Sequence, residues 1–153
     1  MLKTQDEIIK IVKDGQAKGE TFVVTNGCFD ILHVGHVRYL QKTKEFADKL
    51  IVMLNSDRSV KAIKGDSRPI NCEADRAEIL SSLRCVDYVV LFDENSPAKL
   101  LEDIKPNVYT KGADYTLETL PEKDIVIRNN IKVEFIEFVD GKSTTNVIKK
   151  INS

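Results

Sequence analysis

The segment FVVTNGCFDILHVGH, residues 22–36, indicates the fold class of this chain. It begins with a continuously apolar run, which is typical of a strand buried on both faces of a parallel sheet. A loop with glycines at Gly27 and Gly35 follows. The pattern then becomes helical, because Val37, Leu40 and Ala47 share one face of a helix expected over about 36–49. A strand, a glycine-containing loop and a helix make the first half of a βαβ unit.

Short apolar runs alternate with helical spacing along the rest of the chain. We expect five strands, over residues 22–25, 50–54, 88–92, 107–110 and 132–138. Further helices are expected after a capping box at Thr4 and Glu7, over about 72–84, after Pro97, and up to about Ile151. This order predicts an α/β fold, a Rossmann-like doubly wound parallel five-stranded sheet with helices on both faces. We expect one domain over 1–153, with an N-terminal helix in 1–20 and a core in 21–151.

Composition excludes several classes of protein. The chain has 153 residues, 23 basic and 24 acidic, and a net charge of −1, whereas nucleic-acid binders normally carry a basic excess. No apolar run approaches the length of a membrane span. The three cysteines, Cys28, Cys72 and Cys85, lack the spacing of a zinc site and do not indicate a disulfide framework. We therefore expect a cytoplasmic protein whose partners are neither nucleic acid nor membrane.

The chain's two histidines, His33 and His36, lie in the loop that follows the first predicted strand. Ligands of such folds bind beyond the carboxyl ends of the strands, where the strand order reverses. A helix N-terminus there attracts anions, and two imidazoles can become cationic beside phosphates. The group suits attack on the α-phosphorus of a triphosphate. The alternatives are structural histidines, or a metal site completed by Asp30. Cys28 could be a thiol nucleophile, but a small buried cysteine in a tight loop is favoured.

At this motif the chain resembles the HxGH cytidylyltransferase-like nucleotidyltransferases. The resemblance extends from about Phe22 to Ile151 and rests on TNGCFDILHVGH (25–36), NSD (55–57), KGDSRPIN (64–71), KGADY (111–115) and DGKSTTN (140–146). The later segments are similar to those of stand-alone adenylyltransferases that act on a heptose 1-phosphate. The related glycerol-3-phosphate cytidylyltransferases usually carry Arg-Thr-x-Gly-Ile before the Ser-Thr-Thr segment, where this chain has FVDGK (138–142). They remain the main alternative, and a nucleotide-sensing module is the non-enzymatic one.

The resemblance implies transfer of AMP from ATP to heptose 1-phosphate, giving ADP-heptose for the lipopolysaccharide inner core and releasing pyrophosphate. It also implies Mg²⁺ as cofactor, with no metal ligand assigned, and a homodimer. His33, His36 and Lys111 would be catalytic, Lys111 facing the same cleft if its strand neighbours the first. Asp30, Arg68, Asp114 and Asn146 would bind the sugar phosphate. The nucleotide and its phosphates would be bound by Asn26, Gly27, Cys28, Phe29, Gly35, Lys61, Lys64, Arg76, Gly112, Ser143, Thr144 and Thr145.

Two groups in that set have simpler interpretations. Lys61, Lys64 and Arg68 are expected in a mobile loop that closes onto phosphates, yet they could form a plain solvated patch. Ser143, Thr144 and Thr145 could only cap the helix that follows them. A capped helix start is also an anion site, so we expect both roles. The P-loop-like Gly141-Lys142-Ser143 is dismissed, because Ile136 stands where a P-loop requires glycine.

Overall fold

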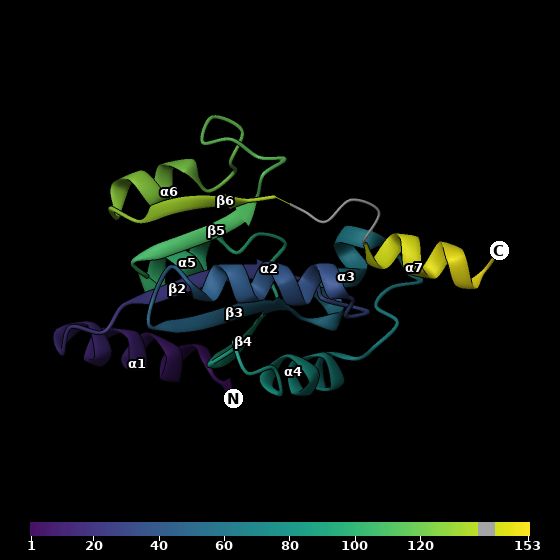
Figure 1. The fold of residues 1–153 in the computed structure, drawn as a ribbon, viewed down its shortest axis with the longest axis horizontal. Coiled ribbons are helices and arrows are strands. Elements are labelled where there is room, and N and C mark those ends of the chain that lie inside the picture. Colours follow the sequence, from purple (N-terminus) through teal and green to yellow (C-terminus); the bar gives the residue numbers. More distant parts are fainter. Residues whose placement is uncertain (138–142) are drawn as a thin grey trace.

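The computed structural model describes residues 1–137 and 143–153 and shows a parallel sheet between two layers of helices (Figure 1). The strands are β1 (Leu2–Lys3), β2 (Phe22–Gly27), β3 (Lys49–Asn55), β4 (Tyr88–Phe92), β5 (Val108–Gly112) and β6 (Lys132–Ile136). The helices are α1 (Gln5–Ala17), α2 (Val34–Lys44), α3 (Asp57–Lys64), α4 (Glu73–Ser81), α5 (Ala98–Ile104), α6 (Lys123–Arg128) and α7 (Thr144–Ile151).

The strand order β1-β4-β3-β2-β5-β6 places β2 where the direction of the chain across the sheet reverses. β2 pairs in parallel with β3 on one side and with β5 on the other. The predicted doubly wound α/β fold is therefore confirmed. Ligands of such sheets bind beyond the carboxyl ends of the strands at this reversal point, so the site is expected just beyond Gly27.

The predicted count of five strands is wrong, because the structure has a sixth, β1, at one edge of the sheet. Leu2 and Lys3 pair with Val89 and Val90 of β4, and the Val89 N–H donates to the Met1 carbonyl at 3.0 Å. Two residues are too few to show any hydrophobic period. This strand therefore depends on its partner and leaves no signal in the sequence.

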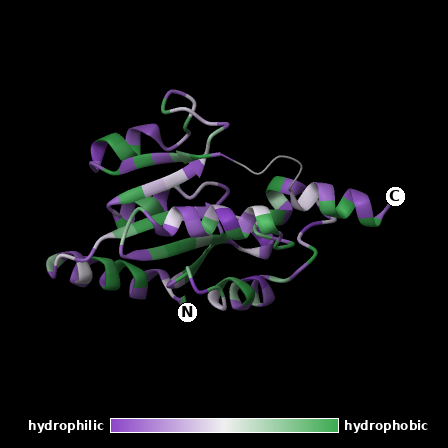
Figure 2. Ribbon diagram, in the orientation of Figure 1, coloured by the Kyte–Doolittle hydropathy of each residue, from purple (hydrophilic) through white to green (hydrophobic). Residues whose placement is uncertain are grey.

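The two faces of the sheet bury separate hydrophobic clusters. In Figure 2, β3 is largely hydrophobic (green), whereas β5 is mostly pale. Val24 packs with the cluster under α1, α5 and α6, whereas Val23 packs with the cluster under α2 and α4. Because side chains alternate along a strand, Thr25 lies on the α2 side and Asn26 on the α1 side. These two neighbouring residues at the end of β2 therefore present their side chains to opposite faces of the sheet.

The helix signals are partly confirmed. Thr4 and Glu7 form the predicted capping box, in which each side chain accepts from the other's backbone N–H, at 3.2 and 2.9 Å. α2 begins at Val34, two residues earlier than expected. Residues 57–64, predicted as part of a loop, form α3, in which the only buried apolar side chain is Val60. The short helix α6 was also not predicted.

The chain leaves the sheet after β6. β6 ends at Ile136, and Phe138, predicted as its last residue, lies outside the described residues. α7 then extends from the carboxyl ends of the strands toward the C-terminus (Figure 1). None of the helices in the described ranges is long and apolar enough to cross a membrane.

Candidate functional site

Arg76 of α4 ties together the segments that follow β2 and β3. Its guanidinium donates to the carbonyls of Cys28 at 2.7 Å, Asn55 at 2.8 Å and Asn71 at 3.0 Å, and to the Asp57 carboxylate at 2.8 Å. The side chain is fully buried. Four of its five N–H groups are engaged, so at most one remains for the predicted contact with phosphate. Arg76 is first of all a structural tie between these loops.

The two histidines are stacked at the start of α2. The ring centroids of His33 and His36 are 3.8 Å apart, with an interplanar angle of 23°. The backbone N–H of His33 donates to Nδ1 of His36 at 3.4 Å. A neutral imidazole that accepts at Nδ1 carries its proton on Nε2. His36 therefore offers an N–H donor that requires no positive charge.

The protonation of His36 is strongly perturbed by its surroundings. Burial, and then the charge of His33, lower the pKa of His36 to about 4. The ring is therefore neutral at pH 7 in the protein without ligand. A phosphate bound beside it would oppose this effect, because negative charge raises the pKa of an imidazole. The cationic form considered from the sequence would thus need a bound anion.

The side chain of Phe29 packs against the His36 ring. Its φ of +46° is uncommon for a bulky residue, and such strain costs of order 1–3 kcal/mol. The Phe29 ring meets the His36 ring edge-on, with centroids 5.1 Å apart. A Cβ atom at Gly27 would lie 2.7 Å from the Phe29 ring. Gly27 therefore leaves the space that the ring needs, and binding of phosphate by Gly27 and Phe29 stays a prediction.

A buried hydroxyl network anchors α2 to the sheet. The Tyr39 hydroxyl lies 2.9 Å from Thr25 Oγ1 and 3.2 Å from Thr110 Oγ1. Thr43 Oγ1 lies 3.3 Å from the same atom of Thr110. Tyr39 follows His36 by one helical turn, and Thr25 and Thr110 belong to β2 and β5. The network therefore sets where the start of α2 stands relative to β2 and β5.

Asp30 holds the 68–71 segment against the histidine loop. Its buried carboxylate accepts from Arg68 Nε at 2.7 Å and from the backbone N–H groups of Ile70 and Asn71 at 2.8–2.9 Å. Burial alone would raise the pKa of Asp30, but these hydrogen bonds and the Arg68 charge outweigh it, and the pKa is lowered. Asp30 and Arg68 were both predicted to bind the sugar phosphate. In the structure they bind each other.

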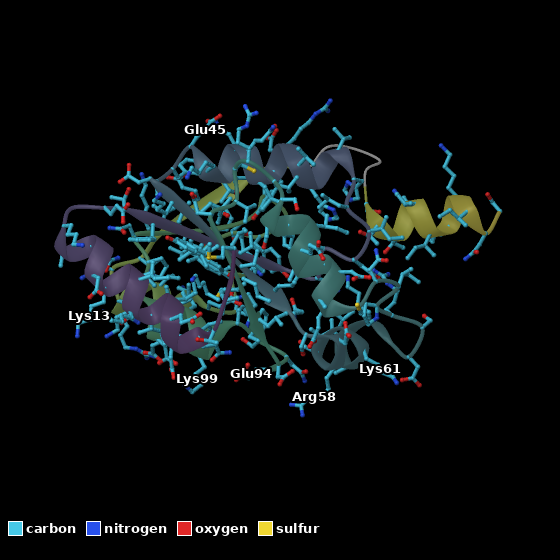
Figure 3. All side chains as sticks on the ribbon, turned by 90° about the horizontal axis from the view of Figure 1, so that it is seen from below. Lys13, Glu45, Arg58, Lys61, Glu94 and Lys99 are labelled. Carbon is cyan, nitrogen blue, oxygen red and sulfur yellow. The ribbon has the colours of Figure 1, made fainter. Side chains whose placement is uncertain are left out.

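The expectation that Lys61 and Lys64 lie in a mobile loop is wrong, because both are on α3. Figure 3 shows Lys61 and Arg58 at the outer margin of the molecule. Burial raises the pKa of the Cys28 thiol, and the positive charge of Lys64 is the first influence that opposes it. The charge of Lys64 thus acts on Cys28, and contact of Lys64 with phosphates stays a prediction. The raised pKa disfavours a thiolate nucleophile at Cys28.

Lys111, at the end of β5, lies beside the end of β2 as predicted. Its Nζ donates to Asn26 Oδ1 at 3.3 Å, and the Tyr109 hydroxyl donates to the same oxygen at 2.6 Å. Burial lowers the pKa of Lys111, and the charges of Glu122 and Asp114 oppose this effect. β5 does neighbour β2, as the prediction required, whereas a cleft shared with His36, the catalytic role of Lys111 and the substrate-binding role of Asp114 stay predictions. Gly112, the next residue, is buried at the strand end.

α7 joins the site through its first turn. Ser143 Oγ accepts from the Asn146 N–H at 3.0 Å, which confirms the capping interpretation. Thr144 Oγ1 donates to the carbonyl of Ile31, also at 3.0 Å, while Thr145 is exposed. The N-termini of α2 and α7 therefore both lie beside residues 28–33, and helix N-termini attract anions. Residues 140–142 of the predicted phosphate segment lie outside the described residues.

The metal-site alternative receives no support from this geometry. Asp30, its third ligand, is committed to Arg68 and two backbone N–H groups. Within residues 1–137 and 143–153, no three or more His, Cys, Asp or Glu side chains are grouped so as to hold a metal ion.

Three tyrosines around the site were missed from the sequence. Tyr39 holds α2, Tyr109 contacts Asn26, and the ring of Tyr115 lies 5.2 Å from Lys111 Nζ. Strand periodicity could have found Tyr109, because it precedes Lys111 by two residues and so shares its face of β5. Tyr115 stands in the KGADY segment, but no pattern indicated that its ring packs on the lysine.

Comparison with known proteins places the chain among nucleotide-transferring enzymes. A family model described as cytidylyltransferase-like matches residues 24–150. Two curated relatives, both called bifunctional protein HldE, come from Geobacter metallireducens and Geotalea uraniireducens. Each is 52% identical to this chain, over 150 and 152 residues that cover 98% and 99% of it. The match covers 31% of each relative, so the chain spans about a third of their length.

Solved structures agree with the fold. A lipopolysaccharide core biosynthesis protein from Thermoplasma volcanium is 30% identical, with a TM-score of 0.63 over 79% of this chain and 98% of that one. Pantothenate synthetase from Thermus thermophilus has a TM-score of 0.67 over 96% of this chain and 67% of that one. At 16% identity, the second likeness concerns the fold alone.

Proposed function

The chain belongs to the cytidylyltransferase-like family of nucleotidyltransferases, and within it we propose an adenylyltransferase that joins AMP from ATP to a heptose 1-phosphate. The products would be ADP-heptose, a precursor of the lipopolysaccharide inner core, and pyrophosphate. The choice of substrates rests on the segments at 64–71 and 111–115, which resemble those of heptose 1-phosphate adenylyltransferases. Similarity to a protein described by its role in lipopolysaccharide core biosynthesis supports the same choice.

The observation that carries the proposal is the placement of donors around the end of β2. The stacked pair His33 and His36 opens α2 on one side, and Lys111 reaches Asn26 from β5 on the other. The first turn of α7 lies near the same loop through Thr144. These groups are N–H donors, a cation and helix N-termini, and all of them favour an anion with several oxygens.

The proposed reaction is a direct in-line displacement. An oxygen of the sugar phosphate attacks the α-phosphorus, the new O–P bond forms, and the bond to the β-phosphate oxygen breaks so that pyrophosphate leaves. The acceptor phosphate is already anionic at neutral pH, so no general base is needed. His36 would donate Nε2–H to a non-bridging oxygen on which charge develops, with His33 beside it. Lys111 and Lys64 would stabilise the charge of the departing pyrophosphate.

Mg²⁺ is expected to arrive with the triphosphate. This ion usually keeps several waters and binds substrate phosphates together with one or two carboxylates, rather than a cage of protein ligands. Asp114 follows the carboxyl end of β5, and its charge acts on Lys111. We expect this carboxylate to contribute to binding of the ion. When bound, the ion would neutralise phosphate charge, and the side chains would still orient the triphosphate.

The proposal is tested by a screen of triphosphates against sugar and polyol phosphates, with released pyrophosphate as the readout. A site built to bond hydroxyls rejects analogues that lack them, because its buried polar groups are then left unpaired. We therefore expect ATP with heptose 1-phosphate to exceed CTP with glycerol 3-phosphate by at least about 10³ in kcat/KM. If CTP with glycerol 3-phosphate is the faster pair, the heptose assignment fails. If no pair releases pyrophosphate, a nucleotide-sensing role is favoured instead.

A further inference from the structure

Asn26 Oδ1 accepts two hydrogen bonds from one face of the sheet. Tyr109 donates through its hydroxyl at 2.6 Å, and Lys111 donates through Nζ at 3.3 Å. The Tyr109 side chain is completely buried, and its contact with Asn26 is the shorter of the two. From this geometry we infer that Tyr109 is a positioning residue, which fixes the side chains of Asn26 and Lys111 for binding a nucleoside triphosphate. The inference rests on the proposed function.

The two hydrogen bonds determine which way the Asn26 amide faces. A lysine ammonium can only donate, so the atom that it contacts must be the amide oxygen. The Nδ2 group of Asn26 therefore points away from Tyr109 and Lys111. Among the described residues, no acceptor bonds to this group. Asn26 is the penultimate residue of β2, directly before the loop that carries the histidines, so a phosphate oxygen there would find a free N–H donor.

Tyr109 also shapes the surroundings of Lys111. The Lys111 Nζ lies 6.0 Å from the centroid of the Tyr109 ring and 5.2 Å from that of Tyr115. No carboxylate of the described residues forms an ion pair with it at 4.0 Å or less. Aromatic faces hold an ammonium without cancelling its charge. The charge of Lys111 thus stays available to an anion, while its position is fixed by neutral groups.

The hydroxyl of Tyr109 keeps its proton at neutral pH and therefore acts as a donor. Burial, and then the charge of Glu122, raise the pKa of Tyr109 well above its usual value. The proton therefore stays on the phenol. A phenylalanine at this position would keep the ring and the packing but lose the bond to Asn26. That single change separates the hydrogen bond from the cation–π contact.

The test measures binding of a non-hydrolysable ATP analogue by calorimetry, in the parent, Tyr109→Phe, Asn26→Ala and the double variant. We expect Tyr109→Phe to weaken binding between about two- and tenfold, the usual worth of one hydrogen bond. If Tyr109 acts through Asn26, the substitution should have almost no further effect in the Asn26→Ala background. Tyr88→Phe, the same chemical change on β4, is the matched control and should bind like the parent.

Each outcome bears on a different claim. Equal weakening by Tyr109→Phe in both backgrounds would show that the hydroxyl does not act through Asn26 and would overturn the inference. Unchanged binding in Tyr109→Phe would do the same. Failure of the parent to bind the analogue would instead count against the proposed function. Should Tyr109→Phe not fold, the Asn26 side-chain NH₂ signals of the parent are followed by NMR, and they must shift when the analogue is added.

Discussion

Replacing His36 by glutamine should make the folded protein less sensitive to acid. The ordinary pKa of histidine, 6.5, applies to the unfolded chain, whereas the folded protein lowers the pKa of His36 to about 4. Between these two values the unfolded chain binds more protons. The free energy of unfolding therefore falls as the pH drops from 7 to 4. Glutamine does not titrate, so this loss should be absent from the variant.

The size of the effect follows from the gap between the two pKa values. Fully expressed, a gap from 6.5 to about 4 is worth about 3 kcal/mol. His36 is only half-buried, and solvent screens part of the interaction. We therefore expect the parent to lose about 1–2 kcal/mol more than His36→Gln between pH 7.5 and pH 4. Other titrating groups, such as Asp30, are common to both proteins and cancel in this comparison.

The measurement is urea unfolding of both proteins at the two pH values, in buffers free of phosphate and sulfate. Anions must be left out, because binding at the start of α2 would raise the pKa of His36. At pH 7.5 the variant should fold normally. Glutamine keeps a neutral N–H donor, so the catalytic role is tested with His36→Ala, which should turn over about 10²-fold more slowly, the usual cost of one transition-state donor. Equal losses of stability in the two proteins would refute the burial that we assign to His36.

Two further substitutions test the basic side chains around the site. Lys64→Ala should lower kcat/KM for ATP while changing the free energy of unfolding by no more than about 0.5 kcal/mol, as for ordinary surface sites. Unchanged turnover would show that this lysine is only a solvated surface charge. Arg76→Met should destabilise the fold by about 3 kcal/mol in urea, because it leaves carbonyls and the Asp57 carboxylate without their donor. The exposed Arg84→Met is its control, and a similar effect in both would contradict the role of Arg76.

Much of the fold could be predicted from local pattern. The apolar strands β2 and β3, the capping box before α1 and the alternation of elements each depend on residues close together in the chain. Their periods therefore appear directly in the sequence. The position of the site also follows, because a doubly wound sheet binds ligands where its strand order reverses. His33 and His36 were identified by their place after the first apolar strand.

Elements whose stability comes from partners were not predictable in this way. β1 has two residues and exists through its pairing with β4. α3 was expected as a loop. In the structure Val60 is its only buried apolar side chain, and its start is capped by the Ser56 hydroxyl, which accepts from Ser59 N–H at 3.2 Å. β1 is too short to show a hydrophobic period, and α3 is a short helix that buries little apolar surface.

The sequence by itself determined the fold class, the family resemblance and the cluster of polar residues at the end of β2. Only the tertiary structure decided how each polar residue is used. Arg76 and Asp30 were grouped with ligand-binding residues, yet their partners are up to 48 residues away in the chain. The amide of Asn26 is oriented by Tyr109, 83 residues later. Hydrogen bonds at such separations depend on the packing of the whole sheet, and no local pattern encodes them.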